Sequence, residues 1–123
     1  METHKEIATS FLQMVASGQI REAYEKYVSP DFFHHNAYFK GDRESLMLAM
    51  EEAQRTDPMK ALEIKMVLAD GDRVAVFSHV KQDSQDRGVA VVHIFRFEGN
   101  QIVELWDVGQ LISEDSPNEN GAF

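Results

Sequence analysis

The stretch that decides the fold is GVAVVHIFRFEGNQIVELWDVGQLI, residues 88–112, which has the pattern of two β-strands joined by a tight turn. Both halves are rich in β-branched and aromatic residues, and Glu98–Gln101 between them has the composition of a turn. Two polar residues interrupt the apolar runs, His93 in the first and Asp107 in the second. An unpaired polar group in an apolar site costs roughly 2–7 kcal/mol. Such residues are therefore either satisfied by neighbours or retained for chemistry.

The overall composition predicts one globular domain that spans residues 1–123. The chain is 43% hydrophobic and 27% charged, and its formal net charge of −9 argues against nucleic acid or an anionic membrane as a partner. It has no cysteine, which excludes disulfides, a thiolate nucleophile and cysteine-ligated metals. The first residues lack the apolar core of a signal peptide, and no run approaches the ~18–20 apolar residues of a membrane span, so we expect a cytoplasmic protein.

The residues before this hairpin predict three helices and further strands. We expect helices from Thr3 or His4 to Gly18, from Ile20 to Val28 and from Asp42 to about Thr56, and strands over residues 61–69 and 74–80. Residues 31–39 are consistent with a first strand or with the extended edge of a lid. This order predicts an α+β domain in which about three N-terminal helices pack on a curved, mostly antiparallel sheet and leave a pocket between the layers. The polar tail, residues 113–123, is expected to be extended or mobile.

The opposite face of the predicted sheet also carries apolar residues. A second copy of the chain would cover them, so we expect a homodimer formed through the sheet. The pocket between sheet and helices is expected to hold a small apolar molecule.

Four segments of the sequence form a recognisable pattern: His35-Asn36 followed by Gly41, the turn Asp70-Gly71-Asp72 before Val74, the run His93-Ile94-Phe95-Arg96, and Ile102–Val108. In these segments the chain resembles the SnoaL-like polyketide cyclase group of the NTF2-like (cystatin-like) superfamily, which is related to ketosteroid isomerase. The resemblance covers nearly the whole chain and implies the cone-shaped NTF2-like fold. This superfamily includes isomerases, cyclases, dehydratases and proteins without catalysis, so the fold alone implies no single function.

The chain departs from the relatives at residues that matter for mechanism. Relatives commonly have an aspartate where His93 stands and a histidine where Leu105 stands. The resemblance matches His93 to the acidic hydrogen-bond donor of ketosteroid isomerase, and Asn36 to its carboxylate base. The steroid-isomerase mechanism therefore cannot apply here unchanged.

His93 and Asp107 are the candidate catalytic residues. Alternation places His93 on the inward face with Phe95, where a neutral imidazole could donate to an enolate oxygen or accept a proton. Asp107 could remove a proton from a carbon next to a carbonyl. The alternatives are a core histidine bonded to a neighbouring strand and an aspartate that serves as a structural acceptor.

The face that Asp107 occupies depends on the turn. A two-residue loop at Gly99-Asn100 pairs His93 with Trp106, whereas a three-residue loop with a glycine bulge pairs His93 with Leu105 and brings Asp107 to the face of His93. The sequence leaves both registers open, and the resemblance favours the second.

Five further residues are candidates for substrate binding. The resemblance places His35 and Asn36 at the pocket mouth, where either could bind a substrate carbonyl, although a polar edge strand is an equal alternative. His79 could face the pocket, but a position on the sheet surface is the simpler interpretation. Phe95 and Trp106 are expected chiefly in the core, with aromatic side chains of this kind lining an apolar cavity.

No cofactor or metal is expected. The chain has no glycine-rich phosphate loop, nucleophile elbow or dinucleotide motif. His35, His79, His93 and Asp107 could supply metal ligands, but their spacing is not that of a metal motif.

The leading hypothesis is a cofactor-independent cyclase or isomerase that removes a proton next to a carbonyl of an apolar substrate. Asp107 would act as base or acid with His93 as its partner, and His35 or Asn36 would position the substrate. The alternative is a non-catalytic domain that holds a small ligand in the same cavity. A third and weaker hypothesis is an interaction module whose dimer surface is its function.

Overall fold

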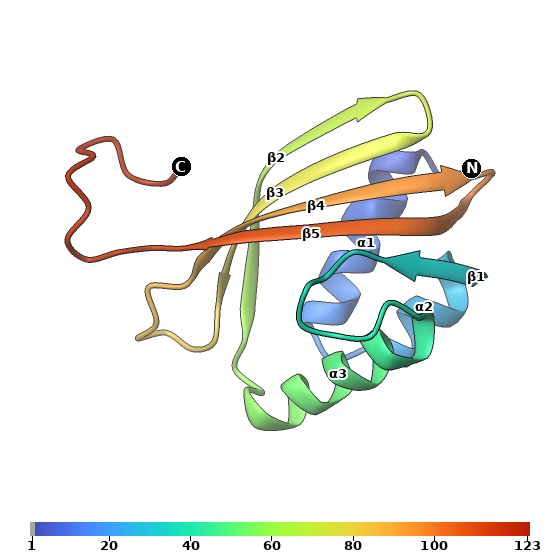
Figure 1. Cartoon of the computed structure of the whole chain (residues 1–123), viewed down its shortest axis with the longest axis horizontal. Coiled ribbons are helices and arrows are strands. Elements are labelled where there is room, and N and C mark those ends of the chain that lie inside the picture. Colours follow the sequence, from blue (N-terminus) through green and yellow to red (C-terminus); the bar gives the residue numbers. More distant parts are fainter. Residues whose placement is uncertain (1) are drawn as a thin grey trace.

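A strongly bent sheet wraps around the helices of this chain, as Figure 1 shows for the computed structural model, which describes residues 2–123. These residues form three helices and five strands, in the order expected for an α+β domain. The elements are α1 (His4–Ala16), α2 (Ile20–Tyr27), β1 (Val28–His34), α3 (Arg43–Thr56), β2 (Ala61–Asp70), β3 (Arg73–Lys81), β4 (Val89–Glu98) and β5 (Gln101–Leu111).

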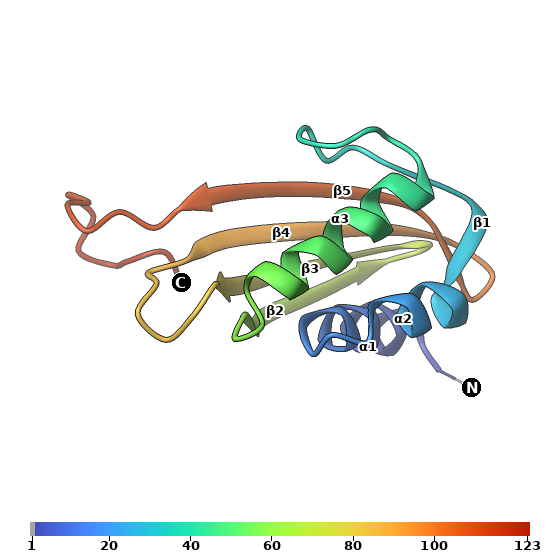
Figure 2. The ribbon, with the colours of Figure 1, turned by 90° about the horizontal axis from the view of Figure 1, so that it is seen from below.

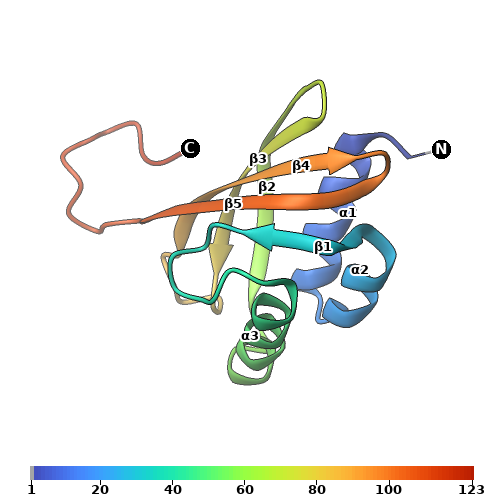
Figure 3. The same ribbon diagram turned by 45° about the vertical axis from the view of Figure 1, so that its right-hand side comes forward.

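The helices begin where the sequence supplies caps. Thr3 and Glu6 form a capping box at the start of α1, and the Asp42 side chain accepts from the backbone N–H of Ser45 at the start of α3. All three helices lie inside the bend of the sheet (Figure 3). The predicted helices and their place on one face of the sheet are therefore confirmed.

The strands are arranged in the order β1-β5-β4-β3-β2. The last four strands form the predicted antiparallel meander, whereas β1 pairs with β5 in parallel. A first strand occurs where it was expected, but its bounds differ from residues 31–39: β1 begins at Val28, directly after α2, and ends at His34. Residues beyond His34 form a loop instead, in which the backbone N–H of Phe39 bonds to the carbonyl of Asn36.

Aromatic rings fill one end of the space between helices and sheet. Phe11 on α1 lies edge-on to Tyr24 on α2, with ring centroids 5.4 Å apart, and to Phe95 on β4 at 5.8 Å. Ile7 completes this part of the core from the first half of α1. Figure 2 shows α1 and α3 on the same side of the sheet. Residues from the second half of α1 and from α3 line the part of the interior that the aromatic rings leave unfilled.

The β4–β5 hairpin has a register that neither expected turn provides. Glu98 pairs with Gln101 around a two-residue turn, but a bulge at Val103 shifts the pairing by one residue. His93 consequently pairs with Asp107, where a plain two-residue hairpin would give Trp106 and the expected glycine bulge would give Leu105. The two candidate catalytic residues thus face the same side, as expected, through a bulge in the strand and not in the turn.

The outer face of the sheet carries exposed apolar side chains, among them Met66, Leu68 and Val108. The tail beyond β5 returns to this face, where the ring of Phe123 lies 5.2 Å from that of Phe77. Within residues 2–123, no helix is long and apolar enough to cross a membrane.

Candidate active site

An apolar pocket lies between the sheet and the helices α1 and α3. Its volume of about 240 Å³ is just below the roughly 300–1,000 Å³ of sites for drug-sized ligands, which favours a small ligand. The lining residues are Leu12, Val15, Ala16, Asn36, Phe39, Leu46, Ala49, Met50, Ala53, Lys60, Leu62, Val80, Val91, His93 and Asp107. Only a few of these residues have polar side chains, and they interrupt an otherwise apolar wall.

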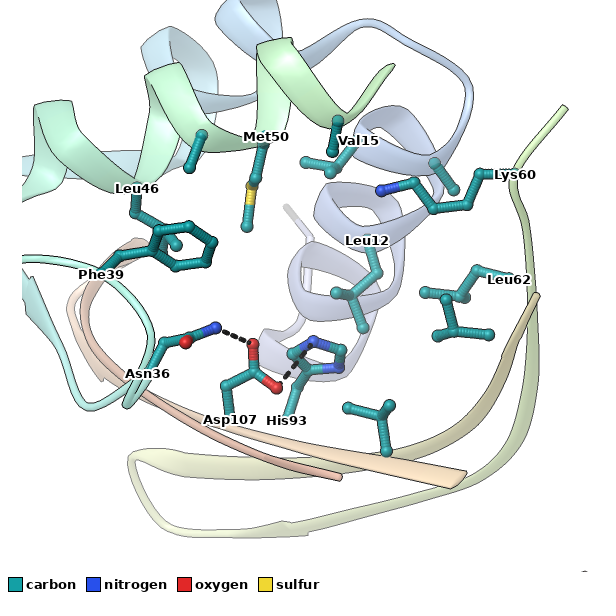
Figure 4. Close-up of a pocket in the computed structure, with 15 residues that line it drawn as sticks. Leu12, Val15, Asn36, Phe39, Leu46, Met50, Lys60, Leu62, His93 and Asp107 are labelled. Carbon is teal, nitrogen blue, oxygen red and sulfur yellow. Dashed lines mark hydrogen bonds and ion pairs between the residues drawn. The ribbon is translucent and has the colours of Figure 1, made fainter. Parts of the chain in front are cut away.

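Asp107, Asn36 and His93 meet on one wall of this pocket, as Figure 4 shows. The Asn36 side-chain N–H donates to Asp107 Oδ2 at 2.9 Å, and His93 Nε2 lies 3.8 Å from Asp107 Oδ1. The second distance is too long for a hydrogen bond. One carboxylate oxygen is thus held by an amide, while the other faces an imidazole across a short gap.

The orientation of the Asn36 amide follows from its own contacts. Its Oδ1 accepts the backbone N–H of Tyr38 at 3.0 Å, which leaves the NH₂ group to point at Asp107. The loop after β1 makes this possible, because its turn brings the Tyr38 N–H back onto the side chain. Asn36 therefore acts as a fixed donor that orients the carboxylate.

His93 is a buried imidazole whose ring nitrogens form no hydrogen bond with another described residue. The residue is 8% exposed, its Nδ1 has no partner, and its Nε2 is 3.8 Å from Asp107 Oδ1. Burial lowers the pKa of His93, and the nearby charge of Asp107 opposes this only in part. At neutral pH the ring is therefore uncharged, and it can offer an N–H donor to a bound molecule.

This arrangement has the parts needed for proton abstraction in an apolar pocket. A positioned carboxylate can accept a proton, and a neutral imidazole and an amide can donate hydrogen bonds to an oxygen on which negative charge develops. Tyr24 is close enough for the charge of Asp107 to add to burial in raising its pKa, but its hydroxyl is turned to the Met50 sulfur at 3.4 Å. We therefore do not include Tyr24 among the reacting groups.

His35 and Trp106 lie on the other side of the sheet, which corrects the expected place of both. The His35 ring stacks on Trp106 with centroids 5.1 Å apart, and its Nε2 lies 2.6 Å from Glu104 Oε2. Glu104 also accepts from the side chain of Arg96 at 2.7 Å. The expectation failed because the strand register sends Trp106 outward whenever Asp107 points inward.

His79 and Phe95 also lie outside the pocket lining. His79 is on the outer face, where its Nε2 lies 2.7 Å from the carbonyl of Arg87 and its ring packs against Phe123. Phe95 is fully buried beneath α1 in the aromatic part of the core. Of the candidate residues, the structure brings together Asp107, His93 and Asn36. No cluster of three potential metal ligands occurs within residues 2–123.

Lys60 was not identified from the sequence as a pocket residue, whereas Phe39 was among the aromatic residues expected in the core or along an apolar cavity. Phe39 belongs to the loop after β1 and packs at the pocket. Lys60 directly precedes β2, whose alternating pattern was recognised. In a strand, side chains two residues apart lie on the same face. Leu62 lies on the inward face of β2, so the same alternation predicts that the side chain of Lys60 also points inward.

Comparison with known proteins gives a consistent family. A family model described as a SnoaL-like domain matches residues 8–105, and no curated protein matches the chain. An NTF2-like protein of unknown function from Cytophaga hutchinsonii is 14% identical, with a TM-score of 0.73 over 89% of this chain and 92% of its own.

Two solved structures provisionally described as polyketide cyclases are also similar. The protein from Sinorhizobium meliloti is 16% identical, with a TM-score of 0.69 over 83% of this chain and 93% of its own. The protein from Acidithiobacillus ferrooxidans is 19% identical, with a TM-score of 0.69 over 89% and 90%. At these identities the likeness shows the NTF2-like fold alone.

Proposed function

The chain belongs to the SnoaL-like domain family, and from this premise we propose that it is a cofactor-independent enzyme that removes a proton next to a carbonyl group. Its substrate would be a small, largely apolar molecule, in keeping with the pocket volume of about 240 Å³. The reaction would be an isomerisation or an intramolecular cyclisation.

The observation that carries this proposal is the position of the Asp107 carboxylate. It is held by Asn36 at 2.9 Å and faces the buried imidazole of His93 at 3.8 Å, within an apolar pocket. Asp107 Oδ1 lines the pocket and has no hydrogen bond to another described residue, so it is free to contact a bound molecule.

In the proposed reaction Asp107 takes a proton from the carbon next to the substrate carbonyl, and the C–H electron pair passes into an enolate. The His93 N–H donates to the enolate oxygen, since the ring is neutral and has no competing acceptor within hydrogen-bond distance at Nε2. In an isomerisation, the protonated Asp107 returns the proton to another carbon. In a cyclisation, the enolate carbon adds to a second carbonyl and the proton goes to the resulting alkoxide.

Deuterium exchange tests the proposal without knowledge of the natural substrate. Small apolar ketones are incubated with the protein in D₂O, and loss of the carbonyl-adjacent C–H signals is followed by NMR. We expect exchange above the buffer rate, and a decrease of about 10²–10⁴-fold in Asp107→Asn, which is the usual contribution of a general base. Ketone binding without exchange in the wild type would indicate a non-catalytic ligand-binding domain instead.

We also propose that a second copy of this chain covers the outer face of the sheet. Met66 and Leu68 on β2 are 51% and 61% exposed on this face, and Val108 is 67% exposed on β5, with β3 and β4 between the two strands. Several exposed apolar side chains on one face of a sheet are typical of an interaction surface. A two-fold axis would place the same patch of each copy against the other. Light scattering after size exclusion should give twice the chain mass, and Leu68→Glu should yield the monomer.

A further inference from the structure

Lys60 is the one lysine or arginine that lines the pocket in the part of the chain that the structure describes. It follows the turn after α3, in which its backbone N–H bonds to the carbonyl of Asp57 at 3.1 Å. Figure 4 shows its side chain reaching over the space from the side opposite Asp107. The pocket therefore has a carboxylate at one end, an ammonium at the other, and apolar walls between them.

The ammonium of Lys60 has no carboxylate partner within residues 2–123. No ion pair or side-chain hydrogen bond joins it to another residue, although the chain has 21 acidic residues and only 12 basic ones. Of the lysines in the described part of the chain, only Lys65 forms an ion pair, with Glu63 at 3.0 Å, so Lys60 differs from the others by its place in the pocket. Lys60 is only partly exposed, so some of its hydration is already lost. An anion in the pocket would supply the missing partner.

From this charge separation we propose that the substrate is a short oxo acid, whose carboxylate binds Lys60 while its ketone lies at Asp107 and His93. The inference rests on the proposed function for the role of the ketone end. The reverse orientation is disfavoured, because it would place the substrate carboxylate against the carboxylate of Asp107 in an apolar site. The hydrocarbon between the two groups would contact residues such as Leu12, Met50 and Leu62.

Matched pairs of acids and esters test the role of Lys60 directly. Levulinate and its longer straight-chain homologues are each compared with their methyl esters, which keep the ketone and chain but lose the charge. Dissociation constants are measured by NMR titration at neutral pH. We expect the acid of the best-fitting length to bind about 5- to 10-fold more tightly than its ester, as for a partly desolvated charge pair.

Three variants separate this contact from a general effect of charge. Lys60→Met should remove the preference for the acid and leave the affinity for the ester unchanged, whereas Lys60→Arg should keep the preference. Lys5→Met, which changes an exposed lysine of α1, should behave as the wild type. Thermal unfolding of each variant checks that the fold is retained.

The outcomes distinguish this inference from the proposed function. Equal binding of acid and ester by the wild type, failure of every acid to bind, or an acid preference that persists in Lys60→Met would overturn the role of Lys60. An acid preference that depends on Lys60, without deuterium exchange next to the ketone, would support the carboxylate site and overturn the proposed catalysis.

Discussion

Asp107 and His93 are directly paired residues of neighbouring strands, yet their side chains stop at 3.8 Å and form no hydrogen bond. Both project from the sheet into the pocket, so the gap between them opens on the space where a ligand would lie. Asn36 reaches Asp107 from a different element, the loop after β1. The loop and the hairpin together thus fix the carboxylate, and changes to either partner should alter its chemistry in different ways.

Asn36→Asp should shift the pH dependence of exchange to higher pH. It replaces the donor 2.9 Å from Asp107 with a second carboxylate, and two carboxylates at that distance share one proton. Proton abstraction then requires removal of that proton, so exchange at neutral pH should fall and recover as the pH rises. Rates of ketone deuteration across the pH range measure this effect.

Asn36→Ala is the matched control for that substitution. It removes the hydrogen bond without adding a charge, so exchange should decrease by about 10-fold with no upward shift of the profile. If exchange had the same pH dependence in Asn36→Asp and Asn36→Ala, the second carboxylate would have no effect on the protonation of Asp107, and the proposed interaction would be contradicted.

His93→Gln should make stability less dependent on pH under mildly acidic conditions. Burial lowers the pKa of His93 from 6.5, so the unfolded chain binds a proton there more readily than the folded protein. This contribution lowers the free energy of unfolding as pH falls below about 6.5, by at most about 1.4 kcal/mol per pH unit. The free energy of unfolding is measured by urea denaturation at several pH values between neutral pH and about pH 5. Its slope against pH should be shallower for the variant than for the wild type.

An unchanged slope in that variant would mean that the folded protein accommodates a charged imidazole beside Asp107. In that case the folded protein would bind a proton at His93 as readily as the unfolded chain does, which would contradict the lowered pKa of this imidazole.

Glu104→Gln should reduce stability without affecting exchange. Glu104 is buried on the outer face and bonds to both His35 and Arg96. Glu104→Gln therefore removes the buried negative charge beside the Arg96 guanidinium and leaves the exposed Glu98, at 3.5 Å, as its remaining ion-pair partner among the described residues. Removing one partner of such a pair typically costs about 1–3 kcal/mol. Chemical denaturation measures the loss, and ketone deuteration by the folded variant should match the wild type.

The pH dependence of this contribution lies in a different range from that of His93. Burial raises the pKa of Glu104, but hydrogen bonds from His35 and Arg96 outweigh it, and the net direction is below the usual 4.5. The stabilisation is therefore present above about pH 4.5 and is lost as pH falls through the lower, folded pKa. A Glu104→Gln variant with reduced exchange but wild-type stability would contradict the assignment of this cluster to structure.

The helices and the meander could be predicted because their signals are local. Asp42 caps α3, and the alternation of β2 to β5 reflects the side chains that each strand buries. The parallel pairing of β1 with β5 was not predictable in this way, since it joins residues about 70 positions apart, such as His34 and Leu105. Pairing of this kind is decided by the packing of the whole domain.

His93 and Asp107 could be identified as candidates from the sequence, but whether they share a face depends on the register of the β4–β5 hairpin. The bulge at Val103 decides that Asp107 points into the pocket and Trp106 points to the outer face. The sequence does not indicate this bulge, because valine is an ordinary strand residue. His35 and Asn36 are adjacent but end on opposite faces, one at Glu104 and one at Asp107. Contact partners of this kind come from tertiary structure.

A substitution that fills the pocket should abolish ligand binding and exchange while the fold is retained. Ala49 on α3 lines the pocket, and Ala49→Phe would place a ring in the apolar space. We expect ketone binding and deuterium exchange to be lost while the melting temperature is unchanged or higher, because the added ring buries apolar surface in existing space. Leu48→Phe is the control, since Leu48 is the preceding residue of the same helix and is 47% exposed. It should leave binding, exchange and stability near wild type, and exchange that survives in Ala49→Phe would place the chemistry outside this pocket.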